Sequence, residues 1–212
     1  MVANKSAATT PFLENGDHLT RQEFERRYAM MPNLKKAELI EGVVYVPAAL
    51  RFESHSQPHG RIMTWLGVYQ AFTPKVKLGD NPTVRLDLDN EPQPDVLLRI
   101  RQGGQSVISV DDYVEGAPEL VAEIAVSSVS MDLHQKLNLY RRHQVQEYIV
   151  WRVEDEMIDW FRLRNGEYVK LEADEQGCLS SEIFPKLCLD TQALLSGNMA
   201  QVMQKLQAAL SE

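Results

Sequence analysis

The chain has 212 residues, with 22 Lys plus Arg against 30 Asp plus Glu, which gives a formal net charge of −8. This charge excludes a protein that holds nucleic acid through an overall basic surface. The composition, 44% apolar and 25% charged, is that of a globular chain and not of a disordered one. We expect a single domain over residues 1–212, with residues 1–16 as a flexible N-terminal segment.

The sequence shows no signal for secretion or membrane insertion. Its first residues lack an apolar stretch, and no segment approaches the roughly 18 uninterrupted apolar residues that a membrane span needs. We therefore expect a cytoplasmic protein. Cys178 and Cys188 have neither a Cys-x-x-Cys spacing nor a His pair nearby, so they predict no disulfide framework and no zinc ribbon.

In the first half of the chain, helical and extended patterns alternate. Apolar residues at helical spacing predict a helix over 19–31, which ends at Pro32. Residues 37–46 are typical of a strand, a turn and a second strand, or of one kinked strand. A longer amphipathic helix is expected over 55–72, followed by a half-buried strand over 84–89 in which apolar and polar residues alternate.

The second half predicts the centre of a sheet. Residues 120–126 are apolar except for Glu123, as expected for a strand buried on both faces. Together the elements predict an α/β (α+β) fold in which helices flank a mixed β-sheet. The remaining expected elements are a strand over 95–100, a helix over 132–144, strands over 148–153, 157–163 and 168–171, and a closing helix over 191–210 broken near Gly197.

Glu123 is the most informative residue, because an unpaired carboxylate inside an apolar strand costs several kcal/mol. One interpretation is an ion pair with Lys or Arg, or a protonated acid in a structural hydrogen bond. The other is a metal ligand. Burial alone favours the first interpretation slightly, so other residues must decide between them.

Two more residues extend this pattern. Asp95 follows Pro94 at the start of a strand, although Pro-Asp also marks ordinary turns. On a helical wheel, Lys136 lies beside the buried stripe formed by Leu133 and its neighbours. The alternative for Lys136 is a surface pair with Asp132, one helical turn earlier, worth about 0.3–0.5 kcal/mol.

Two acids followed by a lysine suit one kind of chemistry. Two carboxylates can hold Mg²⁺ or Mn²⁺ together with several waters. A nearby ammonium group can orient an attacking water and stabilise the negative charge that develops on a phosphorus centre. Asp95, Glu123 and Lys136 are therefore candidates for phosphodiester hydrolysis.

These residues, in this order, resemble the PD-(D/E)XK nuclease superfamily, and within it a widespread restriction endonuclease domain family known as a domain of unknown function. The resemblance covers about residues 20–165, and it rests on the ordered set of segments, since no single one is specific. It implies a restriction-endonuclease-like core. The segments are Ala37 to Gly42, Ser56 to His59, Pro92 to Val96, Pro118 to Ile124, Asp132 to Tyr140 and Glu147 to Val150.

The resemblance also implies roles for individual residues. Asp95 and Glu123 would hold the metal, and Lys136 would be the superfamily lysine, moved in this branch from the strand to the following helix. Glu38 and His59 match a recurrent Glu and His, and they are candidates for a second metal ligand and for a phosphate or water contact. A lone His on an apolar helix stripe is more often a core-edge residue.

The first functional hypothesis is therefore an endonuclease, a hydrolase that cleaves DNA with Mg²⁺ or Mn²⁺ as cofactor. The second is a non-catalytic interaction or assembly protein that retains the nuclease-like fold. The intact set of two acids and a lysine favours the first, whereas the acidic net charge favours the second. Nucleases that act on both strands commonly dimerise, so we expect a homodimer from the class alone.

Overall fold

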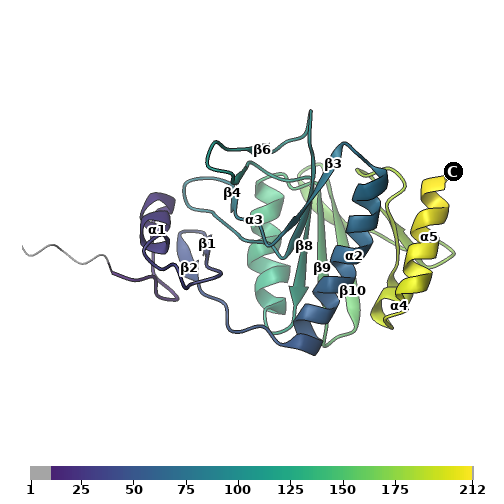
Figure 1. The fold of residues 1–212 in the computed structure, drawn as a ribbon, viewed down its shortest axis with the longest axis horizontal. Helices are drawn as coiled ribbons and strands as arrows, with labels where there is room; N and C mark the ends of the chain where they lie inside the picture. Colours follow the sequence, from purple (N-terminus) through teal and green to yellow (C-terminus); the bar gives the residue numbers. More distant parts are fainter. Residues whose placement is uncertain (1–10, 212) are drawn as a thin grey trace, which may run out of the picture.

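A six-stranded mixed β-sheet forms the centre of the protein, as the computed structural model of residues 11–211 shows (Figure 1). The strand order is β11-β10-β9-β8-β5-β3, and only β8 and β9 run parallel. This confirms the predicted mixed sheet. The strands are β3 (Val76–Asp80), β5 (Val96–Ile100), β8 (Leu120–Ala125), β9 (Glu147–Arg152), β10 (Met157–Arg164) and β11 (Glu167–Lys170).

Helix α2 (Gln57–Phe72) packs against one face of the sheet. Trp65 of α2 meets Trp160 of β10 edge to face, with ring centroids 5.8 Å apart. Helices α4 (Thr191–Leu195) and α5 (Met199–Ser211) join this cluster, and Gly197, with φ of 78°, separates them where the sequence predicts a break.

The opposite face of the sheet is covered by a helix that begins with unusual winding. Residues Met131–Lys136 form the π-helical segment η2, which continues into α3 (Leu137–Arg142). Apolar side chains of α3 pack with residues of β8 and β9 that alternate with those facing α2. Because Glu123 shares its strand face with Val121 and Ala125, it points toward η2 and α3.

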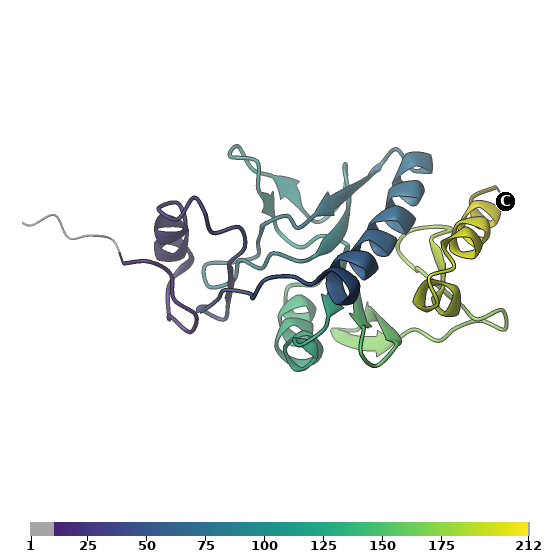
Figure 2. The ribbon, with the colours of Figure 1, turned by 60° about the horizontal axis from the view of Figure 1, so that its bottom comes forward.

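The N-terminal part forms a smaller cluster at one end of the molecule, with α5 at the other end (Figures 1 and 2). Helix α1 (Arg21–Tyr28) packs against the hairpin of β1 (Glu38–Ile40) and β2 (Val43–Tyr45). Leu13 is buried in this cluster, whereas residues 1–10 of the expected flexible segment lie outside the described residues. Leu39 pairs with Glu91, which joins the hairpin to the chain just before β5.

Several short elements differ from the expectation. The strand expected over 84–89 is limited to β4 (Val84–Arg85), because the Asp87 side chain accepts a hydrogen bond from the backbone N–H of Asp89 and turns the chain. Strand β4 belongs to a separate three-stranded sheet of order β4-β7-β6. Strand β3 and four short strands were not predicted: β6 (Val107–Ile108), β7 (Val114–Glu115), β12 (Cys178–Ser180) and β13 (Cys188–Asp190).

No helix within residues 11–211 combines the length and the apolar character needed to cross a membrane.

Candidate active site

Asp95 and Glu123 lie next to each other because of the register between β5 and β8. These strands are antiparallel, with Val96 opposite Ala122. Continuing this register by one residue places Asp95, just before β5, opposite Glu123 on the same sheet face. Asp95 also accepts a hydrogen bond through Oδ2 from the backbone N–H of Ile124, at 2.8 Å. Both carboxylates are buried.

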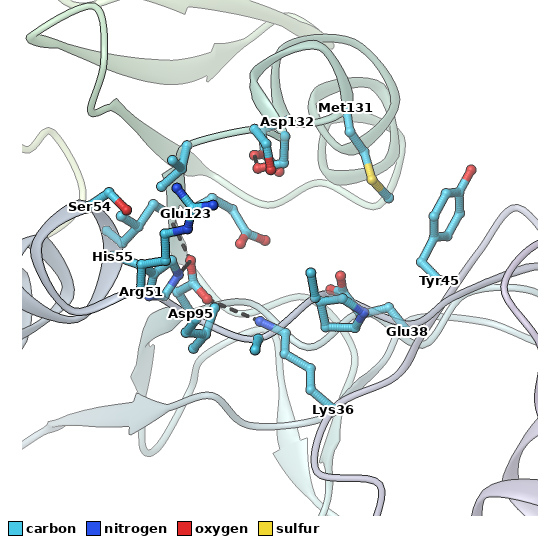
Figure 3. Close-up of a pocket in the computed structure, with 18 of the residues that line it drawn as sticks. Lys36, Glu38, Tyr45, Arg51, Ser54, His55, Asp95, Glu123, Met131 and Asp132 are labelled. Atoms are coloured by element: carbon cyan, nitrogen blue, oxygen red, sulfur yellow. Dashed lines mark hydrogen bonds and ion pairs between the residues drawn. The ribbon is translucent and has the colours of Figure 1, made fainter.

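A cavity of about 470 Å³ opens at this end of the sheet (Figure 3). Asp95 and Glu123 lie on its wall, together with Ser127 and Ser128 from the loop after β8. The segment between β2 and the π-helical turn η1 (Phe52–Ser56) closes another side. Acidic and basic side chains from distant parts of the chain therefore line one concave site.

Lys136 connects three of the acids. Its Nζ lies 2.9 Å from Glu123 Oε1 and 2.9 Å from Glu38 Oε1, and 3.9 Å from Asp132. The side chain is 5% exposed. Burial by itself would lower the pKa of Lys136, but the charges of these three carboxylates raise it well above its ordinary value. Lys136 is therefore a permanent ammonium ion and not a proton acceptor.

Asp132 is part of this buried group, so its pair with Lys136 is not a surface pair. The residue is 2% exposed, and its Oδ2 accepts a hydrogen bond from Ser128 Oγ at 2.5 Å. The difference from the helical wheel has a physical reason: the π-helical winding of η2 has i→i+5 hydrogen bonds, so successive side chains are not spaced by 100°. This winding turns both Asp132 and Lys136 inward.

Asp95 has its own basic partners. Lys36 Nζ lies 3.0 Å from Asp95 Oδ1, and His55 Nε2 lies 3.3 Å from Asp95 Oδ2 (Figure 3). Burial would raise the pKa of Asp95, but the hydrogen bond from His55 and the charge of Lys36 hold it well below its usual range. Asp95 is therefore ionised at neutral pH.

The two weaker candidates lie in different places. Glu38 lines the cavity, and its Oε1 accepts a hydrogen bond from the backbone N–H of Gln93 in addition to the contact with Lys136. His59 does not line the cavity. Its Nε2 lies 3.2 Å from the backbone oxygen of Asp95 and 3.2 Å from Asp80 Oδ1, behind the acid.

Sequence reasoning missed two functional candidates. Lys36 stands in no recognisable motif, and its contact with Asp95 joins residues 59 positions apart. His55 lies on the same predicted helix stripe as His59, and without a His-Glu-x-x-His motif this His pair favours a structural role over zinc binding. The only available signal was its position four residues before His59, because side chains at i and i+4 share a helix face.

Glu123 has the opposite titration behaviour to Asp95. Burial raises the pKa of Glu123 to about 8, and the nearby carboxylates act in the same direction against the charge of Lys136. The cavity is lined by five carboxylates, Glu38, Asp95, Glu123, Asp132 and Glu154, but by only three Lys or Arg side chains, Lys36, Arg51 and Lys136. When all of these groups are ionised, the site carries two uncompensated negative charges.

The donor set fits a hard divalent cation only in part. Within residues 11–211, no three His, Cys, Asp or Glu side chains converge in a way that could hold a metal ion. Mg²⁺, however, is commonly bound through one or two carboxylates while its other ligands are waters. Asp95 and Glu123 supply these two carboxylates, and a divalent ion would balance the excess negative charge.

Comparisons with known proteins point in one direction. The fold is similar to a crystal structure from Anabaena variabilis, described as a putative nuclease belonging to DUF820. The TM-score is 0.63 and the sequence identity 13%, and the match covers 81% of this chain and 96% of that chain. No curated protein shows a significant match. The model of the Uma2 family, described as "Putative restriction endonuclease", matches residues 21–192. The chain therefore belongs to the Uma2 family.

Proposed function

We propose that this protein is a divalent-metal-dependent endonuclease that hydrolyses phosphodiester bonds in DNA. The observation that carries the proposal is that Asp95 and Glu123 both line one open cavity, with Lys136 held 2.9 Å from Glu123. Membership of a family described as restriction endonucleases supports the same activity.

Asp95 and Glu123 would hold the cofactor, Mg²⁺ or Mn²⁺, and Glu38 on the same wall is the candidate for a further ligand. A bound divalent ion lowers the pKa of a water ligand and offsets the charge of a phosphate. The low pKa of Asp95 suits this role, because the carboxylate is ionised and need not lose a proton first.

Lys136 would act through its charge. Since its pKa is raised well above the ordinary value, the ammonium group cannot take a proton from water at neutral pH. It can donate hydrogen bonds to an attacking water and to a phosphate oxygen, and it can stabilise the negative charge that builds up there. Lys36, on the other side of Asp95, offers a second ammonium group to the same phosphate.

His59 has a more limited role in this proposal. It lies behind Asp95 and not in the cavity, so we assign it to holding the backbone of Asp95 in place through its contact with the carbonyl oxygen. The phosphate or water contact implied by the family resemblance passes more naturally to His55, which lines the cavity.

One observation favours the second candidate function, a non-catalytic interaction protein. The carboxylates are already paired within the chain, Asp95 with Lys36 and Glu123 with Lys136. Such pairing is also what a purely structural ion network would show. The two functions differ in whether DNA is cleaved and whether a divalent cation is bound.

The test uses purified protein with plasmid and with single-stranded DNA, in Mg²⁺, in Mn²⁺ and in EDTA. Cleavage should require metal and should be lost in Asp95→Asn, Glu123→Gln and Lys136→Met. Glu172→Gln, which changes an exposed acid outside the cavity, is the matched control and should cleave normally. Unchanged cleavage in all three site variants would defeat the assignment. If the protein neither cleaves DNA nor binds a divalent cation in calorimetry, the result would favour the interaction protein.

A further inference from the structure

A group of basic residues lies at the free edge of the large sheet, away from the cavity. Strand β3 is the outermost strand beside β5, and Lys77 stands directly opposite Arg99. Just beyond the two strands, the backbone N–H of Arg101 donates a hydrogen bond to the carbonyl oxygen of Lys75 at 2.7 Å. We call these four residues the edge cations.

The edge cations face the same side of the sheet as Asp95. Val76 and Ile100 pack in the cluster on the α2 face. Because side chains alternate along a strand, the neighbours of these two residues point to the opposite face, where Leu97 packs. Asp95 lies two positions before Leu97 and therefore shares that face.

These cations differ from most others in the protein because they have no acidic partner. Among the described residues, thirteen Lys and Arg side chains form ion pairs with Asp or Glu. Eight others in the described part of the chain have no such pair, and the edge cations are four of these eight. The carboxylate of Glu119 reaches this end of β5, but it accepts hydrogen bonds from the backbone N–H groups of Ile100 and Gln105.

This arrangement is unfavourable unless something compensates it. Like charges directly opposite each other on neighbouring strands destabilise a sheet, and the protein has 30 acidic residues with which it could have neutralised them. Arg99 is buried, and its guanidinium donates hydrogen bonds only to Ser106. Positive charge is thus concentrated at one edge of an acidic protein.

The edge cations also border a second cavity, of about 340 Å³. Lys77, Arg99 and Arg101 lie on its wall, and Leu97 and Val114 provide an apolar surface between β5 and the small sheet. No carboxylate lines this cavity among the described residues. A ligand with spaced negative charges fits such a surface better than a neutral one does.

We infer that the three exposed edge cations, Lys75, Lys77 and Arg101, bind the phosphate backbone of DNA, outside the site where cleavage takes place. The inference rests on the proposed function. Asp95 and Arg101, which flank β5, are six positions apart, and this separation corresponds to about 20 Å at roughly 3.4 Å per residue. Duplex DNA rises about 3.4 Å per base pair, so a duplex would need about six base pairs or more to extend from the cavity to the edge cations.

Lysine on an edge strand also has a purely structural use, since it discourages pairing with strands of other molecules. For that structural use the charge on β3 is sufficient, and the edge need not bind nucleic acid. A measurement of DNA binding and its salt dependence separates the two explanations.

The experiment measures binding of a fluorescent 20-base-pair duplex to the full chain in EDTA, over a series of salt concentrations. Lys77→Gln, Arg101→Gln and the triple variant Lys75→Gln/Lys77→Gln/Arg101→Gln are compared with the wild type. Each lost phosphate contact should reduce the slope of log K against log salt by about 0.9. Lys186→Gln removes an exposed, unpaired cation elsewhere and should leave binding unchanged, while Arg101→Lys keeps the charge and should retain affinity.

The inference is overturned if the triple variant binds DNA with the wild-type affinity and slope, or if Lys186→Gln weakens binding as much as Lys77→Gln does. Failure of this inference can be distinguished from failure of the proposed nuclease function. Metal-dependent cleavage that needs Asp95 but not the edge cations would support the proposed nuclease and reject the DNA-binding surface. Charge-dependent DNA binding at the edge, with no cleavage in any metal, would support the surface and reject the nuclease.

Discussion

Asp95 accepts a hydrogen bond from the backbone N–H of Ile124, and this contact ties the start of β5 to β8 beside Glu123. The bond is buried and involves an ionised acceptor, which makes it stronger than a bond between neutral groups. It fixes the direction of the Asp95 carboxylate relative to the neighbouring strand. The geometry of the two acids therefore depends on the sheet and not on a loop.

Two variants of Asp95 separate its charge from its hydrogen bond. Asp95→Asn keeps an oxygen that can accept from Ile124, whereas Asp95→Ala leaves that N–H without a partner. We expect Asp95→Ala to lower the free energy of unfolding by about 1.5–3 kcal/mol and Asp95→Asn to lower it by less. Urea denaturation measures both. Equal losses in the two variants would mean that the hydrogen bond contributes nothing.

Lys136→Met should destabilise the protein strongly. The substitution leaves Glu123 and Glu38 buried without their shared cation, and breaking a buried ion pair in this way costs about 3–5 kcal/mol. The double variant Lys136→Met/Glu123→Gln should recover part of the loss, because it also removes the buried acid that is left without its cation. Urea denaturation gives the free energy of unfolding of each variant.

The matched control for Lys136 is Lys170→Met. Lys170 pairs with Asp159, but its side chain is 43% exposed, so this loss should stay below about 1 kcal/mol. Our account of the buried network would be wrong if Lys136→Met cost no more than Lys170→Met, or if adding Glu123→Gln increased the damage.

The sequence predicts the centre of the fold better than its edges. The strand over 120–126 is recognisable because it is almost entirely apolar, and such a pattern follows from burial on both faces. Strand β3 has only a short, mixed pattern, and it becomes a strand through pairing with β5, which no local signal describes. For the same reason, alternation over 84–89 overstates a strand that Asp87 ends early.

The candidate site divides in the same way. Asp95, Glu123 and Lys136 carry local signals, namely a residue after proline, a charge in an apolar strand and a lysine beside a helix stripe. Lys36 and His55 have no such signal, because their contacts with Asp95 come from distant segments brought together by the fold. Predicting them requires the three-dimensional arrangement.

Metal binding should stabilise the protein through the two proposed ligands. A ligand that binds only the folded state at 100 times its dissociation constant adds about 2.7 kcal/mol to the free energy of unfolding. We expect Mn²⁺ or Mg²⁺ to raise the thermal midpoint of the wild type and of Glu172→Gln, and EDTA to reverse the effect. Asp95→Asn and Glu123→Gln should not respond. An equal response in these two variants would place the metal elsewhere in the protein.

Glu91 should make stability depend on pH. It is 3% exposed, and burial, together with the hydrogen bond and charge of Glu25, raises the pKa of Glu91 from its ordinary value of 4.5 to about 8. A raised acid pKa stabilises the folded state below about pH 4.5, and this advantage is lost as the pH rises to about 8. Over that interval, the wild type should lose stability relative to Glu91→Gln by at most about 1.4 kcal/mol per pH unit.

Urea denaturation of both proteins from pH 4.5 to 8.5 measures this difference. Glu172→Gln, a change at an exposed acid, should differ from the wild type by the same small amount at every pH. If the gap between the wild type and Glu91→Gln stayed constant, or if the wild type became relatively more stable at high pH, Glu91 would not hold its proton in the folded state. A wild type that loses stability relative to Glu91→Gln as the pH rises would show that Glu91 holds its proton in the folded state.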